Sequence, residues 1–130
     1  MVDFFRYVWQ YGGVMQKIER WRVQELLLVL EQLSQTLREG KQRDWEKVFS
    51  HYHSETLSIL SRDEINTEEL RRLVRNIQNC FTGVESFRNL NFIEDDNHGL
   101  SDLNREFSHR KSRLIQLLNE LRARLMEYVH

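Results

Sequence analysis

The chain has 130 residues, of which 40% are hydrophobic and 30% charged, a balance typical of one globular domain and too apolar for a disordered chain. Its 19 basic and 20 acidic residues give a formal net charge of −1, so no overall positive field attracts nucleic acid or anionic lipid. Proline, the strongest helix breaker, is absent, which favours long uninterrupted helices.

Residues 1–13 are rich in aromatic side chains and end in Gly12-Gly13, which favours a break in the chain. We expect a short N-terminal helix or arm here, which could dock on the domain or on a second copy of the chain. No apolar run reaches the ~20 residues that a membrane span requires, and no secretory signal is evident. We therefore predict a cytoplasmic protein with no membrane partner.

We expect residues 14–128 to form the main bundle. Apolar side chains at three- and four-residue steps predict its first two helices. The first helix is expected from about Val14 to Arg38, with Gly40 in the left-handed position just past its end. The second is expected to begin with Asp44 as its cap and to end near Ser61.

Asn66 gives the third helix the clearest start in the chain, because Glu69 three residues later completes a capping-box pattern. Gly83 is expected to close this helix. The fourth helix should run from about Leu100 to Tyr128, with Arg110 interrupting its apolar face. Helices that carry apolar residues on one face and are joined by short connections bury those faces best by packing against one another. We predict an all-α fold, an antiparallel four-helix bundle with a short extra N-terminal helix, forming a single domain over residues 1–130.

The titratable residues form no recognisable catalytic, metal or cofactor site. His51 and His53 are two residues apart and point to different sides of a helix, whereas His51 and Glu55 face each other without further ligands. Cys80 is interpreted as a small buried hydrophobic residue. We expect a protein that is not an enzyme and has no cofactor.

Charge is uneven along the chain despite the neutral total. Residues 85–102 carry five acids and one base, and residues 105–124 carry six bases and two acids. Such blocks are usually solvated helix faces. Alternatively, the acidic segment could dock on a basic partner, because complementary potentials speed encounter and favour the correct partner.

The segment between the third and fourth predicted helices, residues 81–90, reads FTGVESFRNL. With the leucines of the first helix and Asp44-Trp45, it resembles, over roughly residues 24–125, an uncharacterised family of small helical bacterial proteins. That family has a Gly-Met-Gly-Ser-Phe-Asn-Asp-Leu-type turn here, and its members look like immunity proteins that accompany toxins. This chain has Glu85 at the family's second glycine and Arg88-Asn89 at its Asn-Asp.

The resemblance implies a non-enzymatic binding protein that neutralises a cognate toxin by direct binding and occlusion, without nucleic acid. Phe87, Leu90 and Phe92 would anchor the turn in the bundle. An acidic turn would suit a toxin with a basic surface. The predicted partner-binding residues are Glu85, Arg88, Asn91, Glu94, Asp95 and Asp96.

Two other functions remain open. Arg105 and His109 are similar to the arginine–histidine motif of helical ribonucleases, in which the pair handles phosphate and proton transfer. Alternatively, the chain could be a structural adaptor that self-associates through its aromatic residues, as a homodimer for example. The residues of that interface would be Phe4, Phe5, Trp9 and Trp21.

Overall fold

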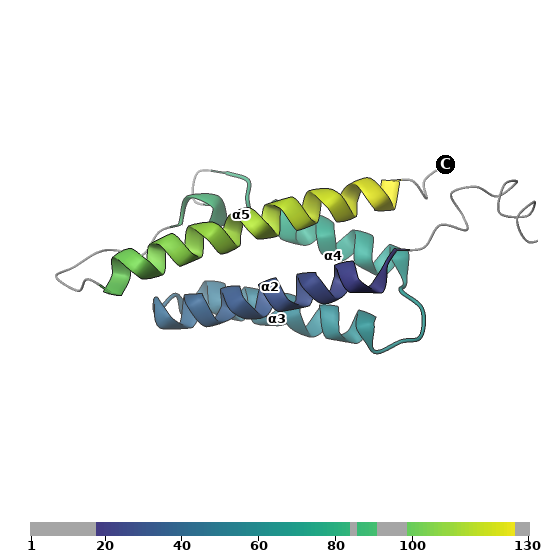
Figure 1. The fold of residues 1–130 in the computed structure, drawn as a ribbon, viewed down its shortest axis with the longest axis horizontal. Coiled ribbons are helices and arrows are strands. Elements are labelled where there is room, and N and C mark those ends of the chain that lie inside the picture. Colours follow the sequence, from purple (N-terminus) through teal and green to yellow (C-terminus); the bar gives the residue numbers. More distant parts are fainter. Residues whose placement is uncertain (1–17, 84–85, 91–98, 127–130) are drawn as a thin grey trace, which may run out of the picture.

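The computed structural model describes residues 18–83, 86–90 and 99–126, and within them the chain is helical with no strand (Figure 1). The helices are α2 (Arg20–Glu39), α3 (Arg43–Leu60), α4 (Thr67–Asn79) and α5 (Gly99–Met126), with a 3-10 turn, η2 (Phe87–Asn89), before α5. The predicted all-α class is confirmed. The predicted N-terminal helix, residues 1–13, lies outside the described residues.

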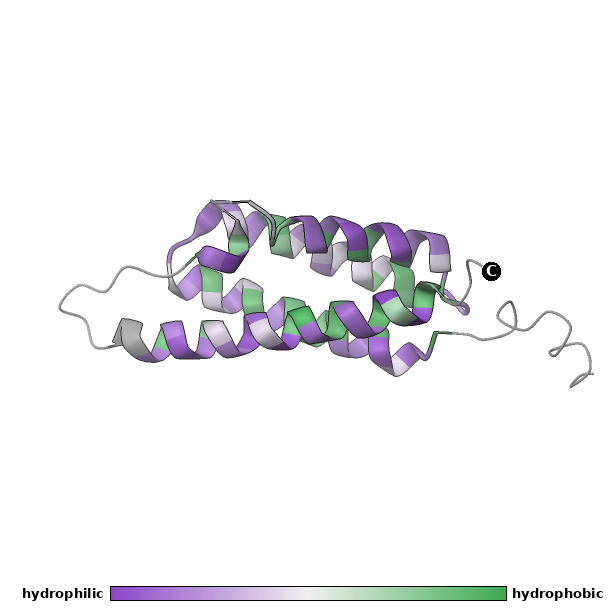
Figure 2. Cartoon of the chain, turned by 90° about the horizontal axis from the view of Figure 1, so that it is seen from above, coloured by the Kyte–Doolittle hydropathy of each residue, from purple (hydrophilic) through white to green (hydrophobic). Residues whose placement is uncertain are grey.

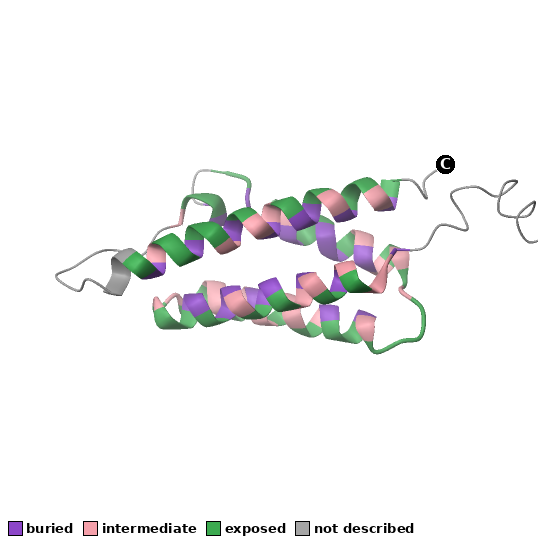
Figure 3. Ribbon diagram, viewed as in Figure 1, coloured by how far each residue is buried: buried purple, intermediate pink, exposed green. Residues whose placement is uncertain are grey.

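The four α-helices surround one core. α2 packs against α3 and α5, and α4 packs against the same two helices. Buried residues lie on the sides of the helices that face each other, and hydrophilic residues cover much of the outside (Figures 2 and 3). The largest fully buried side chains include Phe49, Phe87, Phe107, Leu26, Leu30, Leu70, Ile77 and Leu114. Each helix in the described ranges is too short or too polar to span a bilayer.

The start of the first described helix differs from the prediction. α2 begins at Arg20, and Ile18 and Glu19, which we expected inside the helix, are not helical. Glu19 is the N-cap residue with extended backbone angles, and its carboxylate pairs with Arg22 in the first turn. Ile18 is buried just before it. The apolar periodicity did not reveal this boundary, because apolar residues such as Val14 and Ile18 also precede the start of the helix.

The connection between α2 and α3 also corrects two predictions. Gly40 has φ −84°, and the left-handed residue is Lys41 with φ 59°. α2 continues one residue further than expected, so the reversal falls on Lys41, and Gln42 N–H closes it by donating to the Leu37 carbonyl at 2.8 Å. α3 then begins at Arg43, which places Asp44 inside the first turn, near the positive helix end, and not at the cap.

The start of α4 confirms the predicted cap. The Asn66 side-chain oxygen accepts from the backbone N–H groups of Glu68 and Glu69, both at 3.0 Å. The far end differs: α4 stops at Asn79, and Gly83 lies beyond it with φ +94°, a left-handed angle that suits glycine. The residues between the end of α4 and Gly83 therefore belong to the turn that follows the helix.

Polar contacts join α5 to α2. Arg110, the predicted interruption of the apolar face, donates to Thr36 Oγ1 at 2.5 Å and to the Gln32 carbonyl at 3.2 Å. These hydrogen bonds to α2 replace the ones that the guanidinium group would make with water if it were exposed. Ion pairs continue along the same seam. They join Arg113 to Glu25, Arg22 to Glu120 at 3.2 Å and Arg124 to Glu19 at 3.8 Å.

Candidate functional site

The turn before α5 is anchored by an aromatic cluster, as predicted for Phe87. Its ring is 0% exposed. Ring centroids around it lie at 4.4 Å (Phe49), 5.0 Å (Trp45), 5.3 Å (Phe107) and 5.4 Å (Phe81). Two of these rings come from α3, one from α5 and one, Phe81, from the residues just after α4, so a single side chain ties the turn to all three places.

Lys111 on α5 fastens the same turn from the other side. Its ammonium group donates to the carbonyl of Leu90 at 2.8 Å and to that of Arg88 at 3.2 Å. It also lies 4.3 Å from the centroid of the Phe107 ring, within the range of a cation–π contact. Burial lowers the pKa of Lys111 from its usual value. Residues 86–90 are thus held to α5 by apolar packing and by a buried cation.

Arg88 is the one predicted partner-binding residue that lies within the described ranges. Glu85, Asn91, Glu94, Asp95 and Asp96 lie outside the described residues, as does Phe92, which was predicted to help anchor the turn. Arg88 is exposed, and its Nε donates to the Phe81 carbonyl at 3.4 Å. It stands at one end of a groove that the sequence did not suggest.

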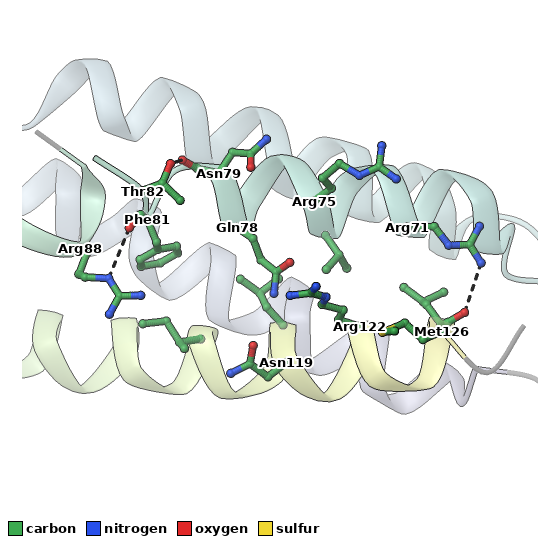
Figure 4. Close-up of a pocket in the computed structure, with 14 residues that line it drawn as sticks. Arg71, Arg75, Gln78, Asn79, Phe81, Thr82, Arg88, Asn119, Arg122 and Met126 are labelled. Atoms are coloured by element: carbon green, nitrogen blue, oxygen red, sulfur yellow. Dashed lines mark hydrogen bonds between the residues drawn. The ribbon is translucent and has the colours of Figure 1, made fainter. Parts of the chain in front are cut away.

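The groove runs between α4 and α5 and has a volume of about 610 Å³, a size found in ligand-binding pockets (Figure 4). Its apolar lining consists of Val74, Phe81, Ile115, Leu118, Leu125 and Met126. Gln78, Asn79, Thr82 and Asn119 add neutral polar groups. No carboxylate of the described residues lines it.

Four arginines complete the lining: Arg71 and Arg75 on α4, Arg88 in the turn, and Arg122 on α5 (Figure 4). Arg71 is tethered, since it donates to the Leu125 carbonyl at 3.3 Å and pairs with Glu68 at 2.6 Å. Arg75, Arg88 and Arg122 have no carboxylate partner within the described part of the chain. The groove therefore combines an apolar surface with three arginines that lack a carboxylate partner among the residues that the structure describes.

This groove was missed because its arginines looked like parts of ordinary charged faces. Arg71 and Arg75 are four residues apart and share one side of α4, which was the one local signal. Arg122 belongs to the basic block of residues 105–124, whose other bases contact partners inside the protein. Those bases are Arg105, Arg110, Lys111, Arg113 and Arg124.

The residues considered for other chemistry lie apart from the groove lining. His51 pairs with Glu55 at 2.6 Å, as expected, and no group of three or more potential metal ligands forms among the described residues. Arg105 and His109 are both exposed, and Arg105 contacts Asp102 at 3.5 Å. Trp21 is half exposed and lies against the Arg22 guanidinium, while Phe4, Phe5 and Trp9 lie outside the described residues.

Cys80 is only partly buried, which corrects the prediction of a simple buried hydrophobic residue. Its Sγ lies 3.4 Å from the Tyr52 hydroxyl, and the two groups bridge α3 and the end of α4. Burial raises the pKa of the Cys80 thiol above its usual 9.0. Burial and the contact with Cys80 also raise the pKa of the Tyr52 hydroxyl above 10.0.

These two shifts predict a loss of stability at alkaline pH. The unfolded chain releases both protons near their usual pKa values, whereas the folded protein retains them, so the free energy of unfolding should fall as pH rises above about 9. The lowered pKa of Lys111 makes the free energy of unfolding rise with pH instead. This contribution is the same in both proteins compared, because both contain Lys111. Urea unfolding between pH 8 and 11 should show a flatter decline for Tyr52→Phe/Cys80→Ala than for the natural sequence. Parallel curves would contradict the prediction.

Comparison with known proteins gave no match to any family model, curated protein or solved structure.

Proposed function

We propose that this protein is a non-enzymatic binding protein of the immunity type, which neutralises a cognate toxin by covering the toxin's working surface. The observation that carries the proposal is the double anchoring of residues 86–90 by Phe87 and Lys111. A binding segment held by its own core loses little conformational freedom when a partner docks, so more of the contact energy appears as affinity. The resemblance of this turn to that of the helical bacterial family supports the same function.

In this proposal the scaffold is an antiparallel four-helix bundle. Arg20 at the start of α2 donates to the Leu60 carbonyl at the end of α3, at 2.8 Å. Arg71 near the start of α4 likewise contacts Leu125 near the end of α5. Contacts between the beginning of one helix and the end of its neighbour support opposite directions within each pair.

The proposed mechanism is occlusion in the bacterial cytoplasm. Glu94, Asp95 and Asp96 would face a basic surface of the toxin, beside Glu85, Arg88 and Asn91. Complementary charge would speed encounter and favour the correct partner, and the fixed turn would set the orientation of the complex.

The test uses the product of the open reading frame beside this gene. Its expression alone should arrest the growth of a bacterial host, and co-expression of the present chain should restore growth. In the purified complex, Glu94→Lys/Asp95→Lys/Asp96→Lys should raise Kd by at least about 100-fold, because three attractive contacts become repulsive. If growth remains arrested although the present chain is co-expressed in folded form, the proposal is wrong.

A matched variant separates contact from overall charge. Glu31→Lys/Glu39→Lys/Asp63→Lys makes the same change in net charge at three exposed positions of α2 and the α3–α4 connection. This control should leave Kd within about threefold. Equal losses in both triple variants would assign the effect to the long-range field and remove the acidic segment from the interface.

A further inference from the structure

The groove between α4 and α5 has the length of a short helix. Its lining runs from Arg71, near the start of α4, to Thr82 and Arg88 beyond the end of that helix (Figure 4). Along α5 the lining extends from Ile115 to Met126, which corresponds to about 17 Å or three helical turns. Its apolar strip between two packed helices is the geometry in which one face of an amphipathic helix docks.

The arginines of this groove differ from those between α5 and α2 in whether they have carboxylate partners. On the α2 side, Arg22, Arg113 and Arg124 each have a glutamate partner. On the α4 side, Arg75, Arg88 and Arg122 have none among the described residues. Several like charges around an apolar surface repel one another, and an anionic occupant would relieve that repulsion.

The lining also favours a peptide over a nucleic acid. Bases bind single-stranded sites by stacking on accessible aromatic rings, but the aromatic residue here, Phe81, is only 7% exposed. The apolar lining residues with accessible surface are Ile115, which is partly buried, and Met126, a flexible thioether side chain that adapts to varied partners. Its 55% exposure leaves room for a partner side chain.

We propose that this groove binds an acidic amphipathic helix of a partner protein, with the apolar face of that helix against Ile115 and Met126 and its carboxylates against Arg75, Arg88 and Arg122. This site goes beyond the proposed function, because it shares only Arg88 with the residues that would contact a toxin, and its other cations, Arg75 and Arg122, belong to α4 and α5. Loss of one interaction therefore does not require loss of the other.

Fluorescence anisotropy with a labelled 16-residue peptide tests the site. The probe carries leucine and phenylalanine at helical spacing and glutamate on both flanks, and we expect micromolar Kd near 0.1 M salt. Arg75→Glu/Arg122→Glu should weaken binding at least tenfold, and Met126→Asp at least threefold. Arg72→Glu/Arg105→Glu, which changes the same charge at exposed arginines outside the lining, should leave Kd within about twofold.

Two further probes make the outcome decisive. A scrambled peptide of the same composition and a single-stranded RNA should each bind at least tenfold more weakly than the amphipathic peptide. Equal binding of either probe, no peptide binding, or equal losses in the groove and control variants would overturn the proposal. Arg75→Gln/Arg122→Gln provides a second test if charge reversal disturbs folding. Circular dichroism checks that each variant is folded.

Discussion

Replacing Phe87 with alanine should lower the free energy of unfolding by about 3–5 kcal/mol. The side chain is fully buried and contacts rings from α3, from α5 and from the residues just after α4, so its removal leaves a cavity that aromatic neighbours cannot fill without moving. Urea unfolding followed by far-ultraviolet circular dichroism measures the change.

The matched control for Phe87 is Leu28→Ala on α2. Leu28 is a large apolar side chain with 53% exposure, so its truncation should change the free energy of unfolding by no more than about 0.5 kcal/mol. If both variants lose the same stability, the aromatic cluster does not hold the turn. The same variants should be tested against the proposed toxin partner, since Phe87 holds residues 86–90, which adjoin the segment proposed to bind it.

Replacing Lys111 with alanine is expected to cost about 2–3 kcal/mol. The substitution removes two charge-assisted hydrogen bonds and leaves the carbonyls of Arg88 and Leu90 to find other donors. The gain from no longer burying a cation offsets part of that loss. Urea unfolding gives the free energy, and hydrogen exchange of residues 86–90 should increase more than that of α2 and α3.

Lys111→Met separates the ammonium group from its aliphatic stem. Methionine keeps most of the packing against Phe107, so a loss close to that of alanine would assign the effect to the hydrogen bonds. Stability equal to that of the natural protein would instead show that the buried charge contributes nothing. Lys47→Ala, at an exposed position of α3, is the control and should be neutral.

The helices could be predicted because their signals are local. Asn66 caps α4 through the two residues that follow it, and α5 begins at Gly99, next to the predicted Leu100. The burial of Phe87 was predicted as well. The errors at Gly40, Lys41 and Asp44 arose where one additional helical residue shifts the whole reversal, a difference too small for apolar periodicity to register.

The groove could not be predicted because its charge depends on which cations have partners elsewhere. In the sequence, Arg113 and Arg122 are equivalent members of one basic block. Packing against α2 gives Arg113 a partner in Glu25, 88 positions earlier, whereas Arg122 lies beside α4. Lys111 presents the same difficulty, since the carbonyls that accept its hydrogen bonds belong to an irregular turn whose path follows from tertiary packing.

The place of α5 in the chain has a consequence for biosynthesis. It is the last described helix to be translated, yet it packs against both α2 and α4 and contributes Phe107, Leu114 and Leu121 to the core. Until residues 99–126 leave the ribosome, the apolar faces of α2 and α4 lack the cover that α5 provides. The nascent chain therefore exposes these faces until α5 has been synthesised, and chaperones that shield such surfaces would act during this interval.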